Sequence, residues 1–184
     1  YNIENPIVID NTGVWRDKKG LGQHIAGGAS KVILTAPGKD DIKNIVFGIN
    51  HADLNADDSI ISAASCTTNA IVPVLKIIND EYVIDHGHIE SIHSYTNDQN
   101  LIDNYHKGDR RGRSAALNMV ITTTGAAKAV VKALPELADK LTGNAIRVPT
   151  PNVSLAVLTL TLEKDVERES LNEYLRKKAF HSNF

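Results

Sequence analysis

The sequence predicts an α/β protein, and three observations lead to that class. Short, nearly continuous apolar runs separated by turn residues are typical of buried strands in a parallel sheet. Other stretches have the apolar spacing of amphipathic helices. The composition, with 42% apolar and 23% charged residues among 184, is that of an ordinary globular protein with a real core.

The first third of the chain predicts strands that alternate with a helix. Apolar runs bounded by Gly, Pro and polar residues mark the strands. Gly27 and Gly28 close the helix, and Pro37 and Gly38 force a loop after the second strand. We expect strands at residues 6–9, 31–34, 45–49 and 59–63, and a helix around 21–26.

The pattern changes after residue 65. Ile71, Val74, Leu75 and Ile78 follow the i, i+3, i+4, i+7 spacing of a helix over residues 67–81. Pro73 lies inside it and should kink the helix or tighten its first turns. Further strands are expected at 88–93, 145–148 and 154–162, the last with alternation, and further helices at 126–134 and 170–178.

A long polar stretch with little periodicity lies between His93 and Met119. Loops longer than about 12–15 residues in a compact domain are usually functional or disordered. This segment is therefore a candidate for function.

Charge and composition exclude several kinds of partner. The net charge is −2, which gives no global reason to expect nucleic acid or an acidic membrane. No apolar run reaches the roughly 20 residues that span a bilayer, and the N-terminus lacks the layout of a signal peptide. A single cysteine cannot form an internal disulfide, so we expect a reducing compartment, the cytoplasm.

That cysteine, Cys66, lies in the string S-A-A-S-C-T-T-N at residues 62–69. Ser65 is a good N-cap, so Cys66 should open the following helix, where the dipole favours a thiolate. A helix terminus supplies only about 0.3–1 kcal/mol. Lowering the pKa of an ordinary thiol by two units requires roughly 1.36 kcal/mol per unit. A reactive Cys66 therefore needs a second positive partner.

His93, at the end of a predicted strand, is the candidate for that partner and for a general base. The alternatives are plain ones: lone cysteines are more often packing residues, and lone histidines are usually surface or core residues. His86 and His88 could share a strand face and bind a metal. Without carboxylate or thiol ligands nearby that signal is weak, and we predict no metal site.

Five ordered motifs extend this pattern along about ninety residues. The string S-C-T-T-N resembles the active-site signature of the phosphorylating glyceraldehyde-3-phosphate dehydrogenases. The family's spacing is also matched, with twenty-seven residues from Cys66 to His93. The other matching strings are H-S-Y-T-N-D-Q at 93–99, R-R-G-R at 110–113, T-T-T-G-A-A-K-A-V at 122–130 and R-V-P-T-P-N-V-S at 147–154.

The resemblance implies a reaction and a role for its two central residues. Cys66 would attack the aldehyde of glyceraldehyde 3-phosphate, and His93 would accept the hydroxyl proton of the thiohemiacetal. Hydride would pass to NAD or NADP, and inorganic phosphate would cleave the resulting thioester to give 1,3-bisphosphoglycerate. A soft sulfur nucleophile suits this chemistry because a thioester conserves the oxidation energy.

The resemblance also implies binding residues. Thr96 and Arg147 match the substrate-phosphate site. Ser65, Thr67, Thr124 and Gly125 match the inorganic-phosphate site, with Arg111 near both. An anion site at Thr124 and Gly125 is also expected without the resemblance, because these residues precede a predicted helix whose N-terminal amides suit an anion.

The polar loop 95–118 matches an S-shaped segment that packs between subunits in the family, which implies a homotetramer. Read alone, the arginines at 110–113 could indicate a nucleic-acid patch, but neither a basic fold nor interleaved aromatic residues support it.

By the same resemblance, the cofactor-binding part of the chain is incomplete. Gly20-Leu21-Gly22 begins like a G-x-G-x-x-G fingerprint, but no third glycine follows and no strand precedes it. Residues 1–64 match the second part of a Rossmann-type NAD-binding domain, in which Thr12, Gly13 and Thr35 border the cofactor. Residues 65–184 match the catalytic domain without its C-terminal end, so the chain is expected to be a central portion of the enzyme. Ala63 replaces an asparagine common in the family.

Three questions stay open at this level. Erythrose-4-phosphate dehydrogenase shares the thiol–histidine chemistry, although Thr124-Gly125 favours the phosphorylating enzyme. A non-catalytic binding module of the same fold is a further alternative. The choice between NAD and NADP is not readable, because the residue that meets the ribose would precede Tyr1.

Overall fold

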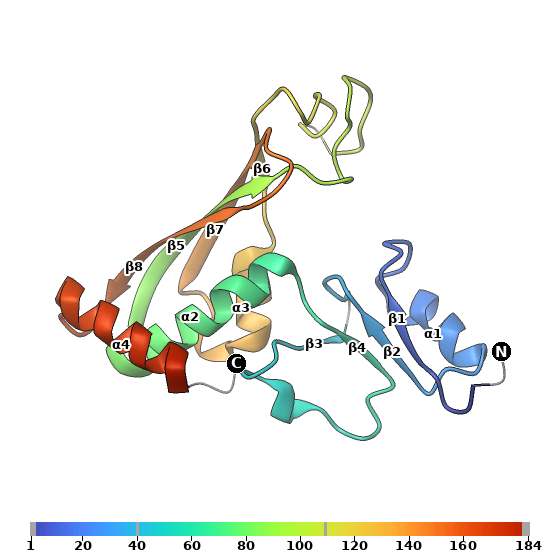
Figure 1. Ribbon diagram of the computed structural model, residues 1–184, viewed down its shortest axis with the longest axis horizontal. Coiled ribbons are helices and arrows are strands. Elements are labelled where there is room, and N and C mark those ends of the chain that lie inside the picture. The colour runs from blue at the N-terminus through green and yellow to red at the C-terminus, as the bar shows by residue number, and fades with distance from the viewer. Residues whose placement is uncertain (1–2, 40, 109, 182–184) are drawn as a thin grey trace. The chain divides into compact units, whose positions relative to one another are not determined.

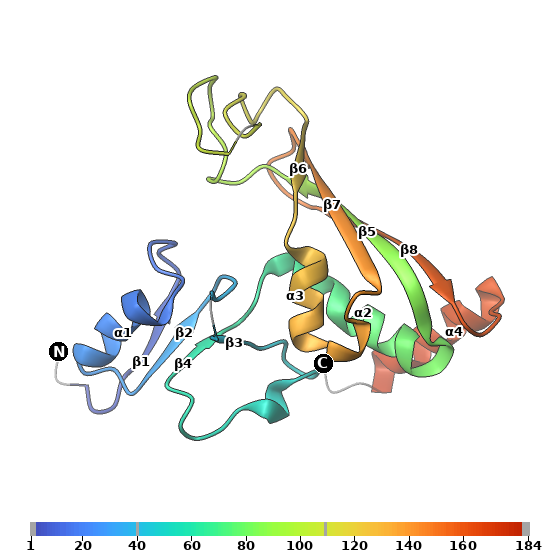
Figure 2. The same cartoon turned by 180° about the vertical axis from the view of Figure 1, so that it is seen from behind.

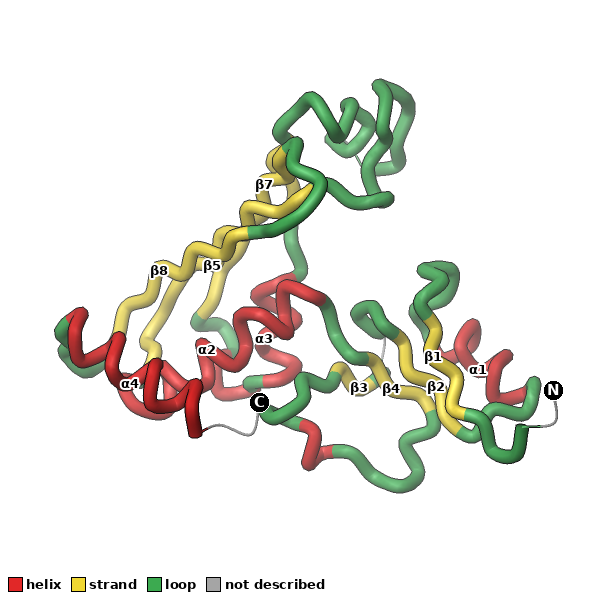
Figure 3. Tube along the Cα trace, in the orientation of Figure 1, coloured by secondary structure: helices red, strands yellow, loops and turns green. Residues whose placement is uncertain are grey.

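The structure is a computed structural model that describes residues 3–39, 41–108 and 110–181. It forms two compact units. The first comprises Tyr1–Glu81, Ala129–Pro135 and Val166–Phe184, and the second comprises Tyr82–Lys128 and Glu136–Asp165. A parallel sheet in the first unit and a mixed sheet in the second confirm the predicted fold class (Figures 1 and 3).

The sheet of the first unit has four parallel strands in the order β1-β2-β4-β3. Its strands are β1 (Ile7–Asp10), β2 (Lys31–Leu34), β3 (Lys43–Asn44) and β4 (Ile60–Ser62). Helix α1 (Lys18–Ala26) connects β1 to β2; the Asp17 side chain caps its start by accepting from Gly20 N, and Gly27 caps its end. Leu21 of α1 packs in a buried cluster with Val32 and Leu34 of β2.

The strand expected at residues 45–49 is wrong. The chain forms only the two-residue β3 before this segment, and residues 47–50 form a turn. Gly48 adopts a positive φ of 82°, and the Asn50 side chain accepts a hydrogen bond from Val46 N. A glycine and an asparagine bend the end of this apolar run. Ile45 N still donates to Ser62 O of β4 at 2.7 Å, but Ile49 N and Asn50 N donate locally to Val46 O, so no strand continues.

Helix α2 (Cys66–Tyr82) begins one residue before the predicted start and contains Pro73. Its buried side chains include Ile71, Leu75 and Ile78 of the predicted stripe, with Val72 buried in place of Val74. Helix α4 (Arg168–His181) belongs to the same unit, and the Tyr174 hydroxyl donates to the Ile77 carbonyl of α2 at 3.4 Å. A short 3-10 helix, η1, covers His51–Asp53.

The sheet of the second unit has the order β6-β7-β5-β8, as Figures 1 and 2 show. Strands β5 and β7 are parallel, whereas β8 and β6 pair antiparallel with β5 and β7. The strands are β5 (Ile84–Ser94), β6 (Val120–Thr123), β7 (Leu141–Val148) and β8 (Leu155–Leu162). Helix α3 (Ala126–Ala133) and the 3-10 helix η2 (Pro135–Leu137) lie between β6 and β7 along the chain. Strand β6 was not predicted, because four residues at a sheet edge leave no periodic signal.

The predicted long loop joins β5 to β6 and folds upon itself (Figure 3). Backbone bonds join Asn100 N to Arg111 O at 3.2 Å, Asn104 N to Gly112 O at 2.9 Å and Ala115 N to Asn100 O at 2.9 Å. The loop therefore keeps a defined backbone without a strand or helix.

In the described part of the chain, no helix is both long and apolar enough to cross a membrane.

Candidate active site

Cys66 occupies the first residue of α2, and its side chain is exposed. Ser65 caps the helix as predicted: its Oγ accepts from Thr68 N at 3.0 Å and lies 2.7 Å from Thr68 Oγ1. Thr67 Oγ1 lies 4.0 Å from the Cys66 sulfur. The thiol is thus placed among hydroxyls at the positive end of a seventeen-residue helix.

The turn before Cys66 is strained and held from both sides. Ala64 has a positive φ of 59°, which costs a non-glycine residue on the order of 1 kcal/mol or more. The Asn69 amide donates to Ala63 O at 2.8 Å and to Ser65 O at 2.9 Å, and Ala64 N donates to Ser62 Oγ at 3.0 Å. These bonds hold the turn, so the start of the helix and the cysteine are fixed in place.

His93, Thr96 and Arg147 come together in the second unit. His93 and Arg147 are directly paired in the parallel β5–β7 register. Arg147 Nη1 lies 3.0 Å from His93 Nδ1, and it donates to Ser94 O at 3.0 Å and Thr96 Oγ1 at 3.3 Å. His93 Nδ1 also lies 2.7 Å from Ser94 O. One guanidinium therefore connects the histidine to the predicted phosphate-binding threonine.

Arg111 lies in the same unit and is held by two contacts. It forms an ion pair with Asp98 and donates from Nε and Nη2 to Thr122 Oγ1, each at 3.4 Å. Sequence reasoning missed Asp98, although an acid within the loop that carries three arginines is a usable signal. Arg111 lines a hollow of about 610 Å³ together with Lys107, Gly108, Arg110, Ile121, Thr122, Gly143 and Asn144. Lys107 and Arg110 bring positive charge to this hollow beside Arg111, whose own charge is paired with Asp98.

Thr124 and Gly125 stand directly before α3. Thr124 Oγ1 accepts from Ala126 N at 3.1 Å, which caps the helix. A Cβ on Gly125 would meet nothing within 4 Å, so an anion has room to approach the backbone there. The arrangement has the features of a helix N-terminus open to an anion.

Thr12, Gly13 and Thr35 gather at the carboxyl edge of β1 and β2, in the first unit. Thr35 N and Oγ1 donate to Asp10 O at 3.0 and 3.2 Å, and Thr12 N and Oγ1 donate to Asp10 Oδ1 at 2.9 and 2.8 Å. Gly13 has a φ of 73° and open space where a Cβ would lie. In open parallel sheets ligands bind at this edge, so these residues fit one border of a dinucleotide.

The predicted site residues are thus divided between the units. Ser65, Cys66, Thr67 and the residues of the β1–β2 edge belong to the first unit. The other six belong to the second, namely His93, Thr96, Arg111, Thr124, Gly125 and Arg147. Among the residues described, no group of three or more His, Cys, Asp or Glu side chains is arranged to hold a metal ion.

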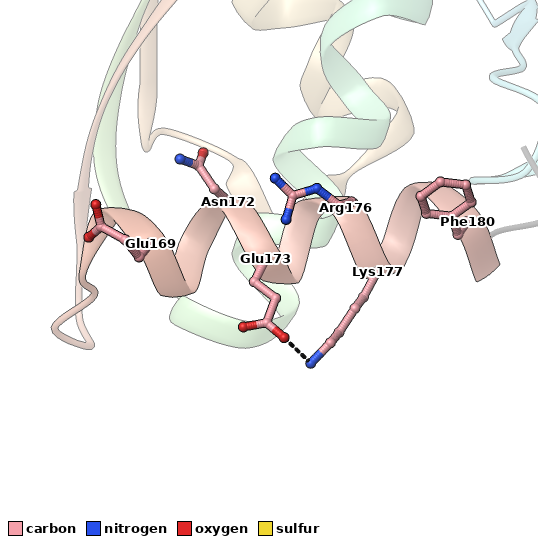
Figure 4. A pocket seen from close by; sticks show the side chains of 6 residues that line it. All are labelled: Glu169, Asn172, Glu173, Arg176, Lys177 and Phe180. Atoms are coloured by element: carbon pink, nitrogen blue, oxygen red, sulfur yellow. Dashed lines mark ion pairs between the residues drawn. The ribbon is translucent and has the colours of Figure 1, made fainter.

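A second hollow, along α4, does not mark this site. A space of about 780 Å³ runs along α4, and Figure 4 shows the six side chains that line it and the Glu173–Lys177 ion pair. All six come from that one helix, and none is a predicted site residue. It is an open helix surface, lined by Glu169, Asn172, Glu173, Arg176, Lys177 and Phe180.

Fold and side chains together define an α/β protein with one parallel sheet, one mixed sheet and an exposed cysteine at a helix start. Residues 65–183 match the family model described as "Glyceraldehyde 3-phosphate dehydrogenase, C-terminal domain". The chain therefore belongs to the glyceraldehyde 3-phosphate dehydrogenase family.

Individual relatives agree with this assignment. A glyceraldehyde-3-phosphate dehydrogenase-like protein of Pseudomonas aeruginosa (strain UCBPP-PA14) is 69% identical over 184 residues, all of this chain and 40% of the relative. Chloroplastic glyceraldehyde-3-phosphate dehydrogenase A of Zea mays is 49% identical, covering 94% of this chain and 43% of the relative. Glyceraldehyde-3-phosphate dehydrogenase 2 of Trichormus variabilis is 47% identical, covering 94% and 52%. The chain spans about half the length of the curated relatives it matches, or less.

Proposed function

We propose that this chain carries the acyl-forming site of a phosphorylating glyceraldehyde-3-phosphate dehydrogenase that uses NAD or NADP. The observation that carries the proposal is the place of Cys66, the only cysteine of the chain, exposed at the capped start of α2. Family membership supports the substrate class, because the relatives are named for this activity. Within the proposal, residues 1–64 are the second part of the cofactor domain and residues 65–184 the catalytic domain.

In the proposed reaction, the Cys66 thiolate adds to the aldehyde carbon, and the new C–S bond gives a thiohemiacetal. His93 donates a proton to the oxygen of this adduct and accepts the proton of the thiohemiacetal hydroxyl again when the hydride leaves. Because His93 Nδ1 faces Ser94 O and Arg147, Nε2 is the nitrogen assigned to that proton. Bound NAD or NADP supplies the oxidant that accepts the hydride. The Cys66 thioester then reacts with phosphate: the new C–O bond forms, the C–S bond breaks, and the thiolate returns.

Within the proposal, hydroxyl, guanidinium and backbone groups at the matching positions hold the anionic groups. Arg147 and Thr96 hold the phosphate of the substrate, supported by their contact at 3.3 Å. Ser65, Thr67, Thr124 and Gly125 receive inorganic phosphate, with Arg111 near both anions. Thr12, Gly13 and Thr35 border the cofactor. Arginine suits these sites because its fork of donors matches phosphate oxygens.

The test is formation of reduced nicotinamide from glyceraldehyde 3-phosphate, NAD or NADP, and phosphate by the 184-residue chain. We expect turnover to fall to background in Cys66→Ser and by about 10²–10⁴-fold in His93→Asn. Iodoacetamide should alkylate native Cys66 at neutral pH about tenfold faster than the urea-unfolded chain. His86→Asn is the matched control, because His86 is exposed on the same strand and its ring nitrogens lie at Asp85 and Thr161.

Two outcomes test the covalent mechanism and the substrate separately. Turnover that survives in Cys66→Ser would reject the covalent mechanism. Turnover on erythrose 4-phosphate that exceeds turnover on glyceraldehyde 3-phosphate would reject the substrate.

A further inference from the structure

Asp10 is a buried carboxylate that the proposed reaction does not use. It ends β1, and the residue is 2% exposed. Its Oδ1 accepts two hydrogen bonds from Thr12, and its Oδ2 lies 2.9 Å from His24 Nε2 of α1. Its backbone carbonyl accepts two more bonds from Thr35. A buried charge persists only when it is paired and hydrogen-bonded, and Asp10 meets both conditions.

These bonds join three separate segments through one residue. The loop after β1, the residue after β2 and the last turn of α1 all contact Asp10. The polar atoms of two residues that border the cofactor in our proposal, Thr12 and Thr35, are thus directed by a single side chain and its carbonyl. Thr12 and Thr35 follow the carboxyl ends of β1 and β2, the edge where ligands bind in open parallel sheets.

His24 completes the arrangement from the helix. Its side chain is 26% exposed, and its ring meets Trp15 edge-on, with ring centroids 5.4 Å apart and planes at 75°. His24 Nε2 and Asp10 Oδ2 thus form a side-chain hydrogen bond between α1 and the end of β1. This pairing also lowers the pKa of Asp10, chiefly through the His24 hydrogen bond, so the carboxylate is retained at neutral pH.

We propose that Asp10 is a positioning residue for the dinucleotide, which sets the Thr12-Gly13 turn and Thr35 for contact with the cofactor while His24 fixes its carboxylate. The inference rests on the proposed function, since it takes the cofactor to lie at this edge. Asp10 itself does not touch the cofactor. Its effect is transmitted through the two threonines and the open backbone of Gly13.

The test measures binding and local order without turnover. Trp15 is the only tryptophan of the chain and contacts His24, so its fluorescence follows titration with NAD and with NADP. Amide hydrogen exchange follows Thr12, whose N–H donates to the Asp10 carboxylate. We expect Asp10→Asn to raise the dissociation constant of the bound dinucleotide about tenfold, as loss of one hydrogen bond to a charged group does, and to speed exchange at Thr12.

Two further variants keep the outcome decisive. His24→Phe retains a ring beside Trp15 but removes the bond to Asp10. It should raise the dissociation constant of the dinucleotide about threefold, and it provides a test if the Asp10→Asn variant does not fold. Asp57→Asn is the matched control, an exposed aspartate for which the expected constant equals that of the wild type.

The inference is overturned by faster exchange at Thr12 with unchanged binding, which would make Asp10 merely structural. It is also overturned by a wild-type chain that binds neither dinucleotide. Weakened binding in Asp10→Asn, in a chain whose wild type binds NAD yet does not turn over, would support this inference and reject the proposed function.

Discussion

Cys66 differs from a packing cysteine in its exposure and in the polar atoms around it. Ser65, Thr67 and Thr68 present hydroxyls beside it, and apolar packing along α2 begins only at Ile71. The strained Ala64 lies two residues before the thiol. Backbone strain at such a place indicates a site that the surrounding hydrogen bonds hold in one arrangement.

Asp10 gives a pH dependence of stability that is testable in this chain. Its pKa is lowered in the folded state from the ordinary value of 3.8, mainly by the His24 hydrogen bond. A lowered pKa means that the carboxylate stabilises the fold fully above the unfolded value and loses that contribution as the pH falls through the folded value. We expect wild type to exceed Asp10→Asn in free energy of unfolding at about pH 5 and to approach it towards about pH 2.

Urea unfolding at a series of pH values measures this difference. Asp57→Asn, measured in parallel, corrects for the general effect of acid on the fold. A gap between wild type and Asp10→Asn that stays constant across the whole range would contradict the assignment.

At the scale of elements, α1 shows how a helix can contain two glycines for different reasons. Both Gly20 and Gly22 lie inside the helix. A Cβ on Gly20 would lie 2.4 Å from Trp15 Cδ1, whereas one on Gly22 would meet nothing within 4 Å. Gly20 is therefore required by packing, and Gly22 only weakens the helix.

The paired substitutions to alanine should shift stability in opposite directions. Gly20→Ala displaces the Trp15 ring and should lower the free energy of unfolding by about 1–3 kcal/mol. Gly22→Ala should raise it by up to about 1 kcal/mol, because alanine favours a helix. Urea titration followed by Trp15 fluorescence measures both, and a shifted native emission spectrum is expected for Gly20→Ala alone. Equal stability of the two variants would contradict the assignment.

At the scale of the whole molecule, the loop between β5 and β6 combines a fixed backbone with exposed apolar side chains. Leu101, Ile102 and Tyr105 are 68%, 74% and 87% exposed. Ion pairs of Arg111 with Asp98 and of Arg113 with Asp103 add to the backbone bonds within the loop. An ordered loop that presents apolar side chains to solvent has the features of an interaction surface. We propose, in line with the family resemblance, that loop 95–118 contributes to a homotetramer.

The double variant Ile102→Ser/Tyr105→Ser should therefore reduce the size of the assembly. Light scattering coupled to size exclusion gives the molar mass directly. Phe180→Ser, which removes an apolar side chain of similar exposure from α4, serves as the control. An unchanged tetramer in the double variant, or a monomeric wild type, would refute the role of the loop.

The sequence by itself determined the elements with strong local signals. Strand β2 and helices α2 and α3 lie within a residue or two of their predicted bounds, because apolar spacing and Ser65 act locally. The strand wrongly predicted at 45–49 and the unpredicted β6 are both short segments. The first is ended by the turn at Gly48, and the second forms because it pairs with β7. The ordered motifs also indicated the family that the C-terminal domain match shows.

Only the tertiary structure decided which distant side chains meet. Arg147 reaches His93 across fifty-four residues because β5 and β7 pair in parallel with those two residues in register. Asp10 meets His24 and Thr35 because β1, α1 and β2 form one crossover unit. Local patterns record burial and backbone preference, whereas such contacts depend on strand register, which is fixed when the sheets assemble and their side chains pack.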